Sequence, residues 1–199
     1  MRKIFIGMGS GRCGTLSLAM LLDLQKNSTV SHEVHPLMPY YENKLAFKAK
    51  IDILLNRKAP NVGDVASSYL GYVPLFIKTF PDIKMVCLKR EKDSCVASFM
   101  RKTKGRNNFQ YGKEPRTLFE ITSPDYPSFY TKEEATELYY DDYYKLAKDL
   151  ETAYPDNFKI FDMEYLNTFE GVNKILEFYD IDEKDRVCTV GLQMNQTEK

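Results

Sequence analysis

The segment from Lys3 to Leu18 constrains the fold of this 199-residue chain more than any other part of it. An apolar run, Lys3–Met8, stops at a glycine-rich turn, and the apolar spacing of Thr15–Leu24 predicts a helix directly after it. A strand that enters a helix through such a turn aims the first helix amides, and the positive end of the helix dipole, at one point. The sequence therefore predicts a binding site for a phosphate or sulfate at the end of the first strand.

The composition of the turn strengthens this prediction. Its glycines let the backbone approach an anion, Arg12 adds a fixed positive charge, and Thr15 and Ser17 add hydroxyl donors. The Walker pattern G-x-x-x-x-G-K-[ST] fits the glycine spacing from Gly9, but Thr15 stands where its lysine should be. The simpler alternative is a glycine-rich turn that binds nothing. The candidate anion-binding residues are Gly11, Arg12, Cys13, Gly14, Thr15, Leu16 and Ser17.

Strand and helix patterns alternate along the rest of the chain. Further strands are predicted at Thr29–Val34, Val62–Val65, Lys84–Leu88 and Phe158–Phe161, and helices at Tyr41–Leu55, Tyr69–Phe80, Asp93–Lys102, Thr131–Tyr154 and Glu170–Tyr179. This order predicts an α/β fold, a three-layer sandwich around a central parallel sheet. Ligands of such sheets bind beyond the carboxyl ends of the strands, so the loops that follow the strands are expected to converge.

Length and composition limit the other possibilities. We expect one domain, 1–199, in which residues 104–131, rich in glycine, proline and aromatic residues, form a lid or acceptor loop. A formal net charge of zero argues against a nucleic-acid partner, and no run of 18 apolar residues indicates a membrane span. Four cysteines without metal-ligand spacing, and no leader at the N-terminus, favour a cytoplasmic protein. Oligomeric state is not indicated.

A second candidate anion site follows the Lys84–Leu88 strand. Arg90 comes at the exit of this strand, and Ser98 lies eight residues later, inside the next predicted helix. A surface arginine and a helical serine are common, so this pair means little alone. Together with the first turn, however, it provides two anion sites at two strand ends. That arrangement suits a nucleoside with phosphates at both ends.

These two motifs resemble those of the P-loop sulfotransferases, which use 3′-phosphoadenosine 5′-phosphosulfate. The Arg12–Leu18 segment resembles their first motif, and the apolar strand before Arg90, with Ser98 eight residues on, resembles their second; the likeness runs from Lys3 to about Arg101. It implies that the first motif holds the 5′-phosphosulfate and the second the 3′-phosphate, with adenosine 3′,5′-bisphosphate as product. No metal is expected, because backbone amides and Arg12 supply the positive charge. Glu91-Lys92 departs from the usual Asp-Pro or Asn-Pro.

Transfer to a hydroxyl also needs a base. The Glu33-Val34-His35 segment resembles the Glu-x-His core that carries the base of heparan-type sulfotransferases, which implies Glu33 as base. Other members use a histidine, so His32 is the second choice. Strand alternation places Glu33 and His35 on one face and turns His32 away, if the strand extends that far.

Two further residues are candidates on the acceptor side. Asp64 stands where relatives often place a lysine, and it either binds a substrate hydroxyl, competes as base or caps a turn. Arg106 belongs to a basic run that either touches an anionic group of the substrates or is simply solvated. The acceptor itself is expected to be a hydroxyl-bearing small molecule, lipid or glycan.

Two other functions remain open. A P-loop nucleotide or small-molecule kinase needs a Walker lysine, which is missing, and a Mg²⁺-binding aspartate at a strand end, for which Asp162 is available. A non-catalytic nucleotide-binding protein on the same fold predicts that Glu33 is dispensable.

Overall fold

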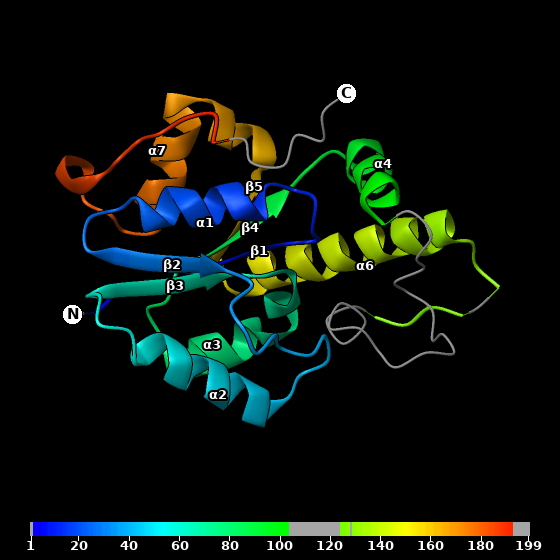
Figure 1. The fold of residues 1–199 in the computed structure, drawn as a ribbon, viewed down its shortest axis with the longest axis horizontal. Helices are drawn as coiled ribbons and strands as arrows, with labels where there is room; N and C mark the ends of the chain where they lie inside the picture. Colours follow the sequence, from blue (N-terminus) through cyan, green and yellow to red (C-terminus); the bar gives the residue numbers. More distant parts are fainter. Residues whose placement is uncertain (1, 104–123, 128, 193–199) are drawn as a thin grey trace.

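Five parallel strands form the central layer of the structure (Figure 1), a computed structural model that describes residues 2–103, 124–127 and 129–192. The strand order is β2-β3-β1-β4-β5, which places β1 in the centre and confirms the predicted α/β fold with a parallel sheet. The strands are β1 Ile4–Gly9, β2 Ser28–His32, β3 Asn61–Val65, β4 Met85–Lys89 and β5 Phe158–Asp162.

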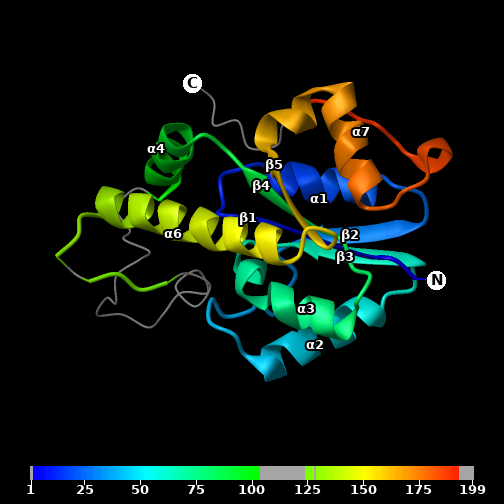
Figure 2. The ribbon, with the colours of Figure 1, turned by 180° about the vertical axis from the view of Figure 1, so that it is seen from behind.

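Helices cover both faces of this sheet, as Figures 1 and 2 show from opposite sides. One apolar cluster joins α1 and α7 to one face, and a second joins α2, α3 and α6 to the other. The α-helices are α1 Thr15–Asp23, α2 Lys44–Leu55, α3 Val73–Thr79, α4 Lys92–Lys102, α6 Lys132–Ala153 and α7 Phe169–Phe178. Short 3-10 helices occupy Ser67–Tyr72, Met163–Asn167 and Glu183–Asp185.

The predicted second strand ends earlier than its sequence pattern indicated. β2 stops at His32 because Glu33 adopts a left-handed backbone conformation, with a φ of 54°, and donates its N–H to the carbonyl of Val65 at 3.1 Å. The two-residue alternation of side chains therefore ends before Glu33. The predicted end of this strand at Val34 was wrong, and the expectation that His32 and Glu33 lie on opposite faces, which required the strand to extend that far, does not apply.

Capping side chains set where several helices begin. The predicted capping box at Thr131 and Glu134 is present, and it starts α6. The carboxylate of Glu91 accepts the N–H groups of Asp93 and Ser94 and starts α4. The side chain of Asn43 caps α2, which begins three residues after the predicted start. The predicted helix Tyr69–Phe80 divides into a 3-10 turn and α3.

Some predictions fall outside the described part of the chain. Most of the 104–131 loop lies there, and so does Arg106. Among the described helices, none combines the length and the apolar character that a membrane crossing needs.

Candidate functional site

The turn after β1 has the geometry of an anion-binding site. A Cβ at Gly9 would lie 2.3 Å from Cys13 Sγ and 2.8 Å from the carbonyl oxygen of Leu88, so only glycine lets the chain turn here against β4. Gly14, with a φ of 88°, is the N-cap of α1 and provides no side chain to cap it. The first turn of α1 carries no acidic residue. Its amides and its dipole are therefore available to an anion.

Two arginines and a serine meet at this turn. Arg12 Nε donates to Ser98 Oγ at 3.2 Å, which joins the β1–α1 turn to α4 across 86 residues of sequence. Arg90 Nη1, at the exit of β4, donates to the carbonyl oxygen of Arg12 at 3.1 Å. Ser98 is nearly buried, and both arginines are half-buried. The two motifs that the sequence separates thus form one cluster with two fixed positive charges.

A histidine also reaches the turn. His32 Nε2 lies 3.0 Å from Thr15 Oγ1, so the last residue of β2 contacts the first residue of α1. The side chains of Glu33 and His35 are exposed beyond the end of β2. Of the residues proposed from sequence as the base, His32 is therefore the one with a hydrogen-bond partner in the anion-binding turn.

Asp64 lies inside the protein rather than at its surface. Its side chain is fully buried, and its carboxylate accepts from Ser31 Oγ at 2.8 Å, from the Val34 N–H at 3.2 Å and from the Tyr69 hydroxyl. Lys50 Nζ, also buried, lies 3.5 Å from it. A substrate hydroxyl would have to displace one of these donors. The binding of substrate by Asp64 stays a prediction.

The side chain of Cys13 is packed inside the turn, next to Gly9, Ser10 and Gly11. Cys13 is completely buried, and burial raises the pKa of its thiol to about 12, so the thiol stays protonated. A second buried thiol, Cys95 on α4, donates to the carbonyl oxygen of Gly11 at 3.3 Å. Cys13 can therefore offer an anion its backbone amide only, while Cys95 helps to hold the turn.

Two tyrosines of α6 brace the site, and the sequence reasoning missed them. The hydroxyl of Tyr140 donates to the carbonyl of Arg90 at 2.6 Å. The hydroxyl of Tyr144 donates to the carbonyl of Leu88 at 2.8 Å and lies 3.2 Å from Ser10 Oγ. Both support the backbone at the exits of β4 and β1. The signal that could have found them is their spacing of four, which places both on one face of the predicted helix.

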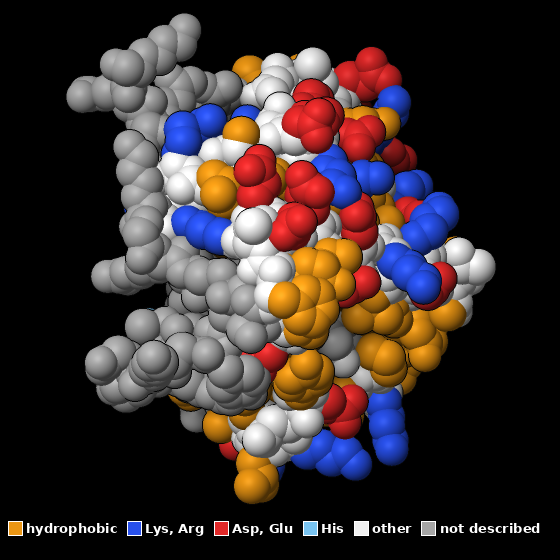
Figure 3. All heavy atoms as spheres, turned by 90° about the vertical axis from the view of Figure 1, so that its right-hand side faces the viewer, with side chains coloured by type: hydrophobic (Ala, Val, Ile, Leu, Met, Phe, Trp, Pro, Cys, Tyr) orange, Lys and Arg blue, Asp and Glu red, His pale blue; other side chains and the backbone are white. Residues whose placement is uncertain are grey.

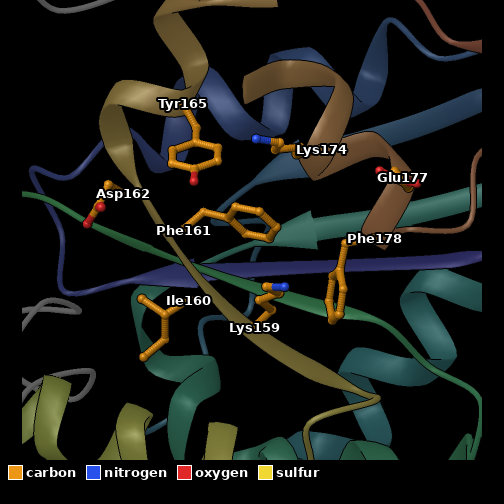
Figure 4. Close-up of a pocket in the computed structure, with 8 residues that line it drawn as sticks. All are labelled: Lys159, Ile160, Phe161, Asp162, Tyr165, Lys174, Glu177 and Phe178. Carbon is orange, nitrogen blue, oxygen red and sulfur yellow. The ribbon is translucent and has the colours of Figure 1, made fainter. Parts of the chain in front are cut away.

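A separate groove lies between β5 and α7 (Figure 4). It has a volume of about 430 Å³ and includes Asp162, the aspartate that a kinase would use for Mg²⁺. β5 is the edge strand next to β4, where Asp162 lies in register with Lys89, and Met163 after it packs beside Gly14 of the β1–α1 turn. No group of three or more His, Cys, Asp or Glu side chains suited to a metal ion occurs among the described residues.

Comparisons with known structures identify the fold. The structure resembles a sulfotransferase from Alicyclobacillus acidocaldarius with a TM-score of 0.57 and 15% identity, covering 98% of this chain and 87% of the other. It resembles mouse sulfotransferase SULT7A1, in complex with PAP, with a TM-score of 0.56 and 15% identity, covering 91% of this chain and 60% of the mouse chain. No family model and no curated protein matches the sequence. The chain thus has a sulfotransferase-like α/β fold.

Proposed function

We propose that this chain is a sulfotransferase that moves a sulfuryl group from 3′-phosphoadenosine 5′-phosphosulfate to a hydroxyl. One observation carries the proposal: Arg12, Arg90 and Ser98 meet at a single turn, although they come from the ends of two different strands and from α4. This turn has no Walker lysine. A nucleoside with an anionic group at each end needs such paired sites. The sulfotransferase-like fold supports the proposal, as does the PAP bound to the mouse protein.

The donor would bind along this cluster. The uncapped amides of α1, with the hydroxyls of Thr15 and Ser17, would hold the 5′-phosphosulfate. Arg90 and Ser98 would hold the 3′-phosphate. Arg12 would bridge the two ends, because its backbone belongs to the turn while its guanidinium reaches Ser98. This extends the sequence interpretation, which assigned Arg12 to the phosphosulfate end alone.

The reaction would be an in-line displacement at sulfur. The acceptor oxygen forms a bond to sulfur while the bond from sulfur to the bridging phosphate oxygen breaks, and adenosine 3′,5′-bisphosphate leaves with that electron pair. Donors fixed in advance around the leaving oxygen stabilise the growing charge without reorganising. The acceptor proton passes to a base within hydrogen-bond reach.

We place His32 ahead of Glu33 as this base. His32 Nε2 is within hydrogen-bond distance of Thr15, in the turn that would hold the phosphosulfate, whereas Glu33 lies one residue further along with its side chain in solvent. Glu33 and His35 remain candidates from the sequence resemblance, since an acceptor bound above the turn could approach either. Comparing His32→Asn with Glu33→Gln separates them.

The acceptor is proposed only as a hydroxyl compound. The strands point toward the right-hand side of Figure 1, and Figure 3 shows this face with acidic and basic side chains interspersed beside an apolar patch. A cytoplasmic location, inferred from four cysteines without metal spacing, belongs to the same proposal.

Thermal unfolding in the presence of nucleotides tests the proposal. A ligand that binds the folded state stabilises it by RT ln(1 + [L]/Kd), so equal concentrations rank affinities directly. Adenosine 3′,5′-bisphosphate should raise the midpoint of thermal unfolding clearly more than ADP, or ATP with Mg²⁺, does at the same concentration. A larger shift with ATP and Mg²⁺ would instead favour a kinase.

A further inference from the structure

A buried ion pair lies beneath the segment that follows β2. Lys50 of α2 and Asp64 of β3 approach to 3.5 Å between Nζ and Oδ2, and their side chains are 1% and 0% exposed. Removing two charges from water costs several kcal/mol per ion, and a well-packed apolar pair is often as stable or more so. Packing alone therefore does not account for these two residues.

Both charged groups hold the backbone around one residue. Asp64 Oδ1 accepts the N–H of Val34 at 3.2 Å, and Lys50 Nζ donates to the carbonyl oxygen of Val34. The peptide groups on either side of Val34 are thus fixed by opposite charges. Immediately before it, Glu33 is held in its left-handed conformation by the bond to Val65. The chain consequently has one defined path as it leaves β2.

Neutral groups complete the cluster. The hydroxyls of Ser31 and Tyr69 donate to the two carboxylate oxygens of Asp64. Arg57 Nη2 in turn donates to Ser31 Oγ at 2.7 Å. Among the described residues, every buried side-chain nitrogen or oxygen has a hydrogen-bond partner. A fully satisfied buried network is rigid and favours a single arrangement. The network spans α2, β3 and the end of β2, so it locks these three elements together.

We propose that Lys50 and Asp64 are positioning residues that hold the segment 32–35 against the anion-binding turn. Through Val34 they fix where Glu33 and His35 emerge, and they fix how His32 reaches Thr15. The proposal rests on the proposed function, because the position of this segment matters for chemistry only if it carries the base. Neither residue touches substrate in this account; both act through the backbone.

The chain contains only two histidines, which makes the position of His32 directly observable. We suggest recording ¹H–¹⁵N spectra of the imidazole rings, assigned with His35→Gln, on the full-length protein. The perturbed protein is the double variant Lys50→Met/Asp64→Asn, which removes both charges and leaves no unpaired buried charge. The matched control is Lys174→Met/Glu170→Gln, which removes an exposed ion pair on α7.

The expected result is specific to His32. Its ring signals should shift or broaden in the Lys50/Asp64 variant and stay unchanged in the control, while the Kd for adenosine 3′,5′-bisphosphate stays within twofold of wild type. Unchanged His32 signals in the folded variant would overturn the proposal. Should that variant not fold, Tyr69→Phe removes one donor to Asp64 and keeps both charges. It should shift or broaden the His32 signals, and an unchanged spectrum overturns the proposal equally.

The same measurements separate this inference from the proposed function. If wild-type protein does not bind adenosine 3′,5′-bisphosphate, the proposed function fails whatever the histidine spectra show. If the nucleotide binds all variants equally and the His32 signals do not respond, the positioning role fails and the proposed function stands. A purely structural role for Lys50 and Asp64 predicts a lower unfolding midpoint with unaltered His32 signals.

Discussion

Arg12 joins the two halves of the proposed donor site, so removing its side chain should weaken nucleotide binding strongly. Arg12 is half-buried, and its Nε lies 3.2 Å from Ser98 Oγ. A phosphate bound here would accept hydrogen bonds from both the guanidinium and the hydroxyl. Hydrogen bonds to charged groups contribute about 1.5–3 kcal/mol each. At about 1.4 kcal/mol per tenfold change, Arg12→Ala should raise the Kd for adenosine 3′,5′-bisphosphate about 10- to 150-fold.

A variant of Ser98, and its combination with Arg12→Ala in a double-mutant cycle, test the same prediction further. Ser98→Ala removes one donor to the charged 3′-phosphate, which contributes about 1.5–3 kcal/mol, so its Kd should rise about 10- to 150-fold. Because Arg12 and Ser98 contact each other, the effects of the double variant should depart from the sum of the single effects by at least about 0.5 kcal/mol. Independent sites would give additive values.

Isothermal calorimetry at one fixed salt concentration measures these constants. The control is Arg101→Ala, which removes the same charge from an exposed position on α4, one turn after Ser98. It should change the Kd less than about twofold, since exposed charges contribute little. An Arg12→Ala protein that binds the nucleotide as tightly as wild type would refute the reasoning. Additive changes in binding free energy for the two single variants and the double variant would refute it as well.

Three further predictions follow from the same geometry. His32→Asn should keep nucleotide affinity and lower turnover of the phosphosulfate donor by about 10²–10⁴-fold, with Glu33→Gln less affected; donor consumption measures both, and the reverse order would return the base to Glu33. Gly9→Ala, whose Cβ would lie 2.3 Å from a sulfur atom and 2.8 Å from a carbonyl oxygen, should lower stability by about 1–3 kcal/mol in denaturant titrations, and full stability would contradict the packing described. Tyr144→Phe loses the 2.8 Å hydrogen bond to β4 and should lower stability by about 0.5–1.5 kcal/mol with weaker nucleotide binding; a silent variant would show that α6 does not brace the site.

Local patterns made the centre of the site predictable. The β1–α1 turn depends on glycines and a helix start that lie within a few residues of each other, so Lys3–Leu18 predicted the strand, the turn and α1 to within one residue at the ends. The exit of β4 at Arg90 was predictable for the same reason. In both places the local preference of the chain agrees with the global fold.

The end of β2 was not predictable in the same way. The pattern of Thr29–Val34 favours a continuing strand, but the left-handed conformation at Glu33 is fixed by Val65 and by the buried pair beneath Val34. These contacts come from residues that are distant in sequence. The position of His32 against Thr15 depends on that same strand end, so strand alternation could not predict it.

The burial of Asp64 was not predictable from the sequence either. The family resemblance suggested a role for Asp64 on the acceptor side, and the structure adds that Lys50 of α2 pairs with it inside the protein. The amphipathic pattern of α2 does not identify one of its lysines as buried. Tyr140 and Tyr144 likewise acquire their roles only when α6 packs across the exits of β1 and β4.

The central claim is that two anion motifs converge to bind both ends of one nucleotide. The most direct test compares the calorimetric Kd of adenosine 3′,5′-bisphosphate with that of adenosine 5′-monophosphate, which lacks only the 3′-phosphate. Arg90 and Ser98 would lose their ligand, so the monophosphate should bind at least about 100-fold more weakly, in line with two charge-assisted contacts. Equal affinity for the two nucleotides would contradict the account.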